Sequence, residues 1–154
     1  MKNILTLGTL LISLSLLSAC TEDGQTHPEL ITSDFHDCYN SKPWDSASMA
    51  NQLVGSWKFI EQGCIVNSQV ADEVIVAFDS LGFFTVSEKS NVVTQGSWKL
   101  KMCDKNFNGV DSTMFELDLD KPSAYLFGVI LPCENQVMFW ESYTDGCNTF
   151  FEKE

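Results

Sequence analysis

Residues 104–112 carry oxygen-bearing side chains at alternate positions, a spacing that suits a metal ion. Asp104, Asn106 and Asn108, followed by a glycine, match the first half of a calcium-binding loop. The match then fails, because Phe115 stands where such a loop needs a bidentate glutamate. An Asn-Gly pair in a polar stretch also suits a plain hairpin turn. The sequence therefore leaves both a calcium site and an ordinary turn open.

Acid–base catalysis has few candidate residues in this chain. Both histidines, His27 and His36, lie near the N-terminus, without a Ser or Cys partner at a recognisable spacing. Glu61 and Glu141 alternate with apolar residues, so each is either an inward-facing carboxylate in a ligand site or a solvated acid at the rim of the fold. The sequence predicts a binding protein rather than an enzyme.

Cys20 closes an apolar segment at the N-terminus. A positively charged start and an apolar run too short to span a bilayer precede it. The last four residues of the segment, Leu-Ser-Ala-Cys, resemble the lipobox of bacterial lipoproteins. That resemblance implies that residues 1–19 are a signal peptide and that the Cys20 thiol is acylated, with palmitate as one chain. The protein would then be an outer-membrane lipoprotein that is periplasmic or exposed at the cell surface.

The composition is strongly acidic. The 154 residues include 21 Asp and Glu against 9 Lys and no Arg, and the formal net charge is −12. A nucleic-acid-binding surface needs clustered Lys and Arg, so we exclude that class of function. An acidic surface repels anionic lipid headgroups, which leaves membrane attachment to the lipid anchor. The same surface would attract a basic protein partner.

The chain after the anchor divides into a tether and one domain. Residues 20–43 are polar and have no apolar period, which predicts a lipidated flexible tether. In residues 44–154, Asp45 or Ser46 caps a short helix that ends at Leu53. Beyond it, apolar and polar residues alternate in eight runs separated by turn residues. The expected strands lie within residues 57–60, 74–78, 84–86, 96–102, 115–119, 125–131, 136–143 and 148–151.

The tetrapeptide Gly-Ser-Trp-Lys occurs twice, beginning at Gly55 and at Gly96. It resembles the Gly-x-Trp motif of lipocalin and calycin barrels, and the chain from Leu53 onward resembles the lipocalin-like domain of Bacteroidota lipoproteins. The resemblance implies an all-β, single eight-stranded antiparallel up-and-down barrel whose base is closed by the short N-terminal helix. Trp57 and Trp98 would fill the barrel, and the glycines would let another segment cross closely. The basic side chain that commonly stacks on the motif tryptophan is either missing here or supplied by a lysine.

The remaining cysteines sort by the two rims of such a meander. Cys64 and Cys147 lie on one rim, beside strands that become neighbours when the barrel closes, so we predict a Cys64–Cys147 bridge. Cys38, Cys103 and Cys133 belong to the opposite rim. We prefer a Cys103–Cys133 bridge with Cys38 left as a thiol, because Cys38 lies on the expected tether.

The resemblance implies a binding protein that holds a small apolar ligand inside the barrel. The expected ligand-binding side chains are those of Trp57, Phe59, Phe84, Trp98, Leu117 and Phe139. The alternative is an interaction or inhibitor lipoprotein that docks a basic partner protein through its acidic surface. A cation–carboxylate contact of that kind weakens as ionic strength rises, which would distinguish the two.

Overall fold

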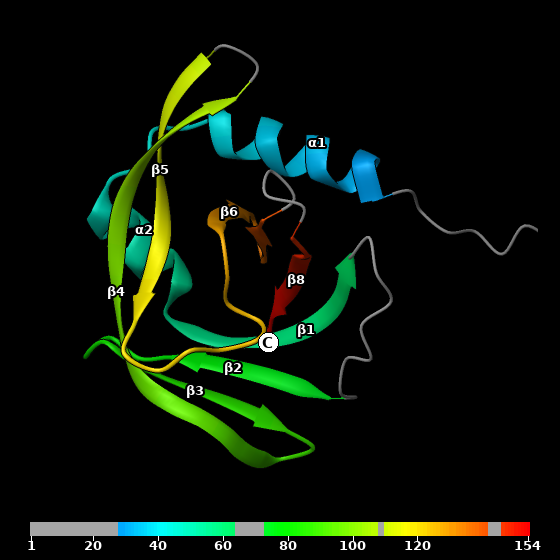
Figure 1. Ribbon diagram of the computed structural model, residues 1–154, viewed down its shortest axis with the longest axis vertical. Coiled ribbons are helices and arrows are strands. Elements are labelled where there is room, and N and C mark those ends of the chain that lie inside the picture. The colour runs from blue at the N-terminus through cyan, green and yellow to red at the C-terminus, as the bar shows by residue number, and fades with distance from the viewer. Residues whose placement is uncertain (1–27, 64–72, 108–109, 142–145) are drawn as a thin grey trace, which may run out of the picture.

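The computed structural model describes residues 28–63, 73–107, 110–141 and 146–154. These residues form two helices and eight strands (Figure 1). The helices are α1 (Pro28–Asn40) and α2 (Ser46–Leu53). The strands are β1 (Gly55–Gly63), β2 (Val74–Phe78), β3 (Phe83–Glu88), β4 (Asn91–Phe107), β5 (Val110–Leu119), β6 (Val129–Cys133), β7 (Gln136–Trp140) and β8 (Asn148–Lys153).

The strands close into one antiparallel barrel. Each strand pairs with the next along the chain, and β8 returns to pair with β1. The predicted fold class, a closed eight-stranded up-and-down barrel, is therefore confirmed. Closure pairs the edges that an open sheet of these strands would leave exposed. The alternation of apolar and polar residues decides which side faces inward: Val74, Val76 and Phe78 of β2 are buried, whereas the intervening Ile75 and Ala77 are half-buried.

Helix α2 is capped by Asp45, one of the two caps that the sequence predicts, and the cap is a capping box. The Asp45 carboxylate accepts a hydrogen bond from the Ser48 backbone N–H (2.7 Å), and the Ser48 hydroxyl accepts one from the Asp45 backbone N–H (3.0 Å). These bonds to Ser48 lower the pKa of Asp45. Met49 and Leu53 of α2 are fully buried, so the helix packs its apolar side against the barrel just before β1.

Helix α1 corrects the prediction of a flexible tether. Residues Pro28–Asn40 are helical, and Phe35 and Tyr39 on this helix are only 5% and 6% exposed. Phe35, Cys38 and Tyr39 follow the i, i+3, i+4 spacing that places side chains on one side of a helix. This stripe is hard to recognise in the sequence because the residues between its members are polar and acidic. The segment 28–40 is thus part of the folded domain.

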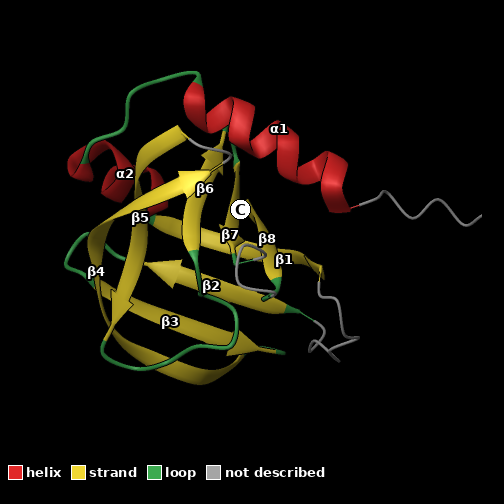
Figure 2. Cartoon of the chain, turned by 45° about the horizontal axis from the view of Figure 1, so that its top comes forward, coloured by secondary structure: helices red, strands yellow, loops and turns green. Residues whose placement is uncertain are grey.

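The buried side of α1 covers the outer face of β6–β8 (Figure 2). The Phe35 ring meets the Phe150 ring of β8 edge-on, with centroids 5.6 Å apart. The His36 ring lies 4.3 Å from the Trp140 ring, and the Tyr39 hydroxyl donates to the Thr113 carbonyl. Because the barrel interior lies behind these strands and α1 in front, β6 and β7 are buried on both faces.

The disulfides correct the preferred pairing on this rim. Cys38 of α1 is bonded to Cys133 at the end of β6, with Cα atoms 5.5 Å apart, and Cys103 keeps its thiol. The prediction of a Cys103–Cys133 bridge is therefore wrong, because it treated Cys38 as mobile, whereas α1 fixes it against β6. Cys147 is also disulfide-bonded. Its predicted partner, Cys64, lies outside the described residues, so the Cys64–Cys147 pairing stays a prediction.

The barrel interior is packed with aromatic side chains. Trp57 has no exposed surface, its indole N–H donates to the Leu53 carbonyl (2.6 Å), and the Lys153 ammonium lies 5.1 Å from the ring centroid. Lys153 thus supplies the basic partner that the sequence left open. The Phe151 ring meets the rings of Phe59 and Phe139 edge-on at 5.9 and 5.8 Å, an arrangement that aromatic rings favour.

Candidate functional site

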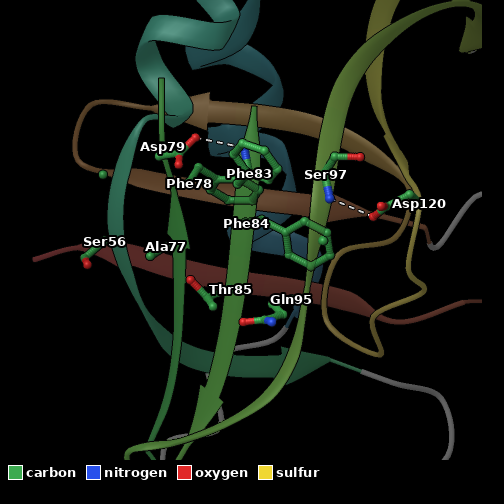
Figure 3. Close-up of a pocket in the computed structure, with 12 residues that line it drawn as sticks. Ser56, Ala77, Phe78, Asp79, Phe83, Phe84, Thr85, Gln95, Ser97 and Asp120 are labelled. Atoms are coloured by element: carbon green, nitrogen blue, oxygen red, sulfur yellow. Dashed lines mark hydrogen bonds between the residues drawn. The ribbon is translucent and has the colours of Figure 1, made fainter. Parts of the chain in front are cut away.

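A row of uncharged side chains, three of them short, crosses the outer face of β1–β4. Ser56, Ala77, Thr85 and Gln95 are successive cross-strand partners in the barrel register. They point away from the interior, because their sequence neighbours Trp57, Phe78 and Phe84 are buried. Such short side chains leave the sheet surface low, and a hollow of about 700 Å³ opens over them (Figure 3).

Glycine and phenylalanine form the end of this hollow nearest α2. Gly55, Phe78, Phe84 and Gly96 are also successive partners across the same four strands, and all four line the hollow. Because the glycines have no Cβ, neighbouring side chains can approach the backbone closely here. A Cβ on Gly96 would meet the Phe84 ring at 3.1 Å and collide with the Asp120 carboxylate, so any larger residue at this strand position would displace one of these side chains.

Two carboxylates flank an exposed aromatic ring at the rim. Oδ1 of Asp79 accepts hydrogen bonds from the backbone N–H groups of Leu81 (2.9 Å) and Phe83 (2.8 Å). Oδ1 of Asp120 accepts one from the backbone N–H of Ser97 (2.7 Å). Phe83 and Ser97 are cross-strand partners, so the two carboxylates are fixed on either side of one residue pair. Figure 3 shows both carboxylates directed toward these backbone groups.

The two Gly-Ser-Trp-Lys copies meet at this hollow. Ser56 from the first copy and Ser97 from the second both line it, while Trp57 and Trp98 point into the core. The sequence predicts a role in the fold for the glycine and tryptophan of each copy and assigns none to the serines. The two serines line one hollow because of the register of β1–β4. The repeated tetrapeptide is the feature of the sequence that could have pointed to them.

The side chains expected to hold an apolar ligand lie in the barrel interior. Trp57, Phe84, Trp98 and Phe139 are all buried, and Phe59 and Leu117 are half-buried against the core. A void large enough for a water molecule leaves accessible surface on its walls, yet Trp57 has none and Phe139 only 1%. The interior is thus filled around these two. Phe84 alone of the six also lines the outer hollow.

The Glu61 side chain faces outward, so of the two positions that the sequence left open for it, the inward-facing one is wrong. A bulge shifts the register of β1 between Phe59 and Glu61, so Phe59 pairs with the inward-facing Phe151 whereas Glu61 pairs with the outward-facing Phe150. Glu61 is exposed beside α1. Glu141 is half-buried where β7 ends, and its backbone N–H donates to the Asn148 side chain (3.1 Å).

The backbone at the candidate calcium residues does not fit a calcium loop. Asp104 pairs with Thr113 and Asn106 with Asp111 in an uninterrupted β4–β5 ladder, so the chain there is a long hairpin. The Asp104 carboxylate accepts a hydrogen bond from the Thr113 hydroxyl (3.2 Å). Asn108 and the side chain of Asn106 lie outside the described residues. Within the described part of the chain, no three His, Cys, Asp or Glu side chains gather as a metal site would need.

Comparison of the chain with family models, with curated proteins and with solved structures gives no match. The fold itself is a lipocalin-like barrel. Neither described helix is long and apolar enough to cross a membrane. The lipobox ending at Cys20 lies outside the described residues.

Proposed function

We propose that this protein is a lipid-anchored binding protein of the bacterial cell envelope that takes a small, partly apolar ligand in the outer hollow of β1–β4. The hollow is the observation that carries the proposal. At about 700 Å³ it lies within the size range of small-molecule sites. Its lining combines phenylalanine with hydroxyl, amide and carboxylate groups, the mixture that orients a ligand as well as burying it.

The site proposed here differs from the one expected from the sequence. A ligand inside the barrel would have to displace side chains such as Trp57 and Phe139, which already have at most 1% exposed surface. The outer hollow needs no such rearrangement. We also propose that the protein binds without catalysis, since the carboxylates of Asp79 and Asp120 accept hydrogen bonds from backbone N–H groups rather than from a serine hydroxyl, and the lining contains no histidine, cysteine or lysine.

The lipid anchor belongs to the same proposal and rests on the sequence around Cys20. Acylation would hold the barrel at the outer membrane, and several acyl chains hold a protein far more firmly than one. Metabolic labelling with a palmitate analogue should mark the wild-type protein in the membrane fraction. Cys20→Ala should lose both the label and the membrane association. A membrane-bound, unlabelled wild-type protein would contradict acylation.

The ligand site can be tested by filling the hollow. Thr85→Leu places a branched side chain at the centre of the short row, whereas Ser87→Leu makes a comparable change two residues along the same strand and outside the lining. Amphiphilic compounds that raise the melting temperature of the wild-type protein should still do so with Ser87→Leu and fail with Thr85→Leu. Compounds that stabilise both variants equally would place the site elsewhere, with the barrel interior as the alternative.

A further inference from the structure

We propose, building on the proposed function, that the ligand of the hollow is a small molecule with an alkylammonium group. The ammonium would lie at the rim between Asp79 and Asp120, and the alkyl part over the ring of Phe83. The polar groups that the rim leaves available and the charge of the lining favour this class over neutral or anionic ligands.

The rim offers hydrogen-bond acceptors. In each carboxylate, Oδ1 accepts hydrogen bonds from the backbone. Among the described residues, none donates a hydrogen bond to Oδ2 of Asp79 or of Asp120. An ionised carboxylate only accepts hydrogen bonds, so the matching ligand group must donate them. An alkylammonium carries three donors and a positive charge, which makes each such bond stronger than a neutral one.

The exposed ring of Phe83 suits the same group. Its side chain is 56% exposed although it lies between two fixed carboxylates. A cation near the face of an aromatic ring is attracted by the negative face of the π system, and an alkyl chain gains by covering the apolar ring. Ala77 and Thr85 leave room for that chain along the row behind Phe83.

The charge of the lining argues against an anion. Asp79 and Asp120 are its charged residues, and it contains no lysine. The stems of Lys121 and Lys153 lie beside Gly96 and Gly55 at the edge of the hollow, but neither lysine is part of its lining. The formal net charge of −12 adds a field that concentrates cations at the surface. A phosphate or carboxylate ligand would face repulsion from both sources.

The test compares three ligands of one chain length that differ in charge: hexylammonium, hexanol and hexanoate. Calorimetric titration of the purified protein at neutral pH should show hexylammonium binding at least about fivefold more tightly than hexanol, with hexanoate weakest. The preference should shrink at high ionic strength, because the rim is open to solvent. Asp120→Asn should reduce the preference for hexylammonium, whereas Asp118→Asn, the same change outside the lining, should leave it intact.

The possible failures have different meanings. If hexanol binds as tightly as hexylammonium and Thr85→Leu abolishes both, the ammonium assignment is overturned while the hollow remains the site. If hexylammonium binding survives Thr85→Leu, both the assignment and the proposed site are overturned. If a lysine-rich peptide binds at the rim while hexylammonium does not, the small-molecule class is wrong and the hollow docks a basic protein.

Discussion

The two halves of the barrel bury their strands differently. On β6–β8, α1 covers the outer face, and large apolar side chains such as Leu131, Met138 and Phe150 are buried there. On β1–β4 the outer face carries Ser56, Ala77, Thr85 and Gln95, and no described helix covers it. The strands of both halves pack their inner faces on one hydrophobic core. The comparison indicates that one outer face contributes to stability, whereas the other is left open, as the proposed binding site requires.

The largest expected effect comes from releasing α1. The double variant Cys38→Ser/Cys133→Ser removes a bridge between residues 95 positions apart. On the chain-entropy account, this loss lowers the free energy of unfolding by about 4.7 kcal/mol. Urea denaturation measures the loss, and hydrogen exchange should show α1 opening first. Cys103→Ser serves as the control, and a loss as large as that of the double variant would contradict the assigned role of the bridge.

Two phenylalanines compare the halves directly. Phe35→Ala empties a buried position between α1 and β8 and should lower the free energy of unfolding by about 3 kcal/mol. Phe83→Ala removes an exposed ring from the open half and should change it by less than about 0.5 kcal/mol. Chemical denaturation of both variants gives the answer. Equal losses would mean that the outer face of β1–β4 contributes to stability as the covered face does.

Gly96, at the end of the hollow nearest α2, should tolerate little change. Gly96→Ala forces a Cβ against the Phe84 ring and the Asp120 carboxylate, so we expect a loss of about 1–3 kcal/mol in the free energy of unfolding. It should also weaken ligand binding, because Asp120 must move from the rim. Ser97→Ala, at the next position, should cost much less. A fully stable Gly96→Ala protein would show that the side chains of Phe84 and Asp120 can move aside without cost.

The smallest expected effect is the pH response of the α1 contact. Burial lowers the pKa of His36, and Asp37 opposes that shift. Because the folded state holds the neutral form more firmly than the unfolded state, the contribution of His36 is complete above about pH 6.5, its unfolded value, and is lost as the pH falls through its lower folded pKa. His36→Gln should reduce the pH dependence of the melting temperature in this range. An unchanged profile would contradict the assignment.

Part of the secondary structure can be predicted from local sequence patterns. The period of two in residues such as 74–78 and 115–119 predicts strands, and the turn residues between the runs predict their antiparallel order. The cap at Asp45 likewise predicts α2. These features depend on neighbours within a few positions, so they can be read without knowing the fold.

Other features needed partners distant in sequence. Helix α1 is held by Phe150 and Cys133, more than 90 residues away, so its polar sequence alone looked like a tether. The bulge at Phe59 and Glu61 sends Glu61 outward, which strict alternation could not anticipate. The disulfide prediction failed for the first of these reasons, since it assigned mobility to a helix that packing had fixed.

The sequence by itself determined most of the strands, the helix α2 and the acidic composition, and its resemblance to lipocalin-like domains implied the closed barrel. Only the tertiary structure decided that Cys38 pairs with Cys133, that Lys153 stacks on Trp57, and that Ser56 and Ser97 line one hollow. The physical reason is that local pattern fixes which side of a strand is apolar, whereas cross-strand register and helix docking fix which distant side chains meet.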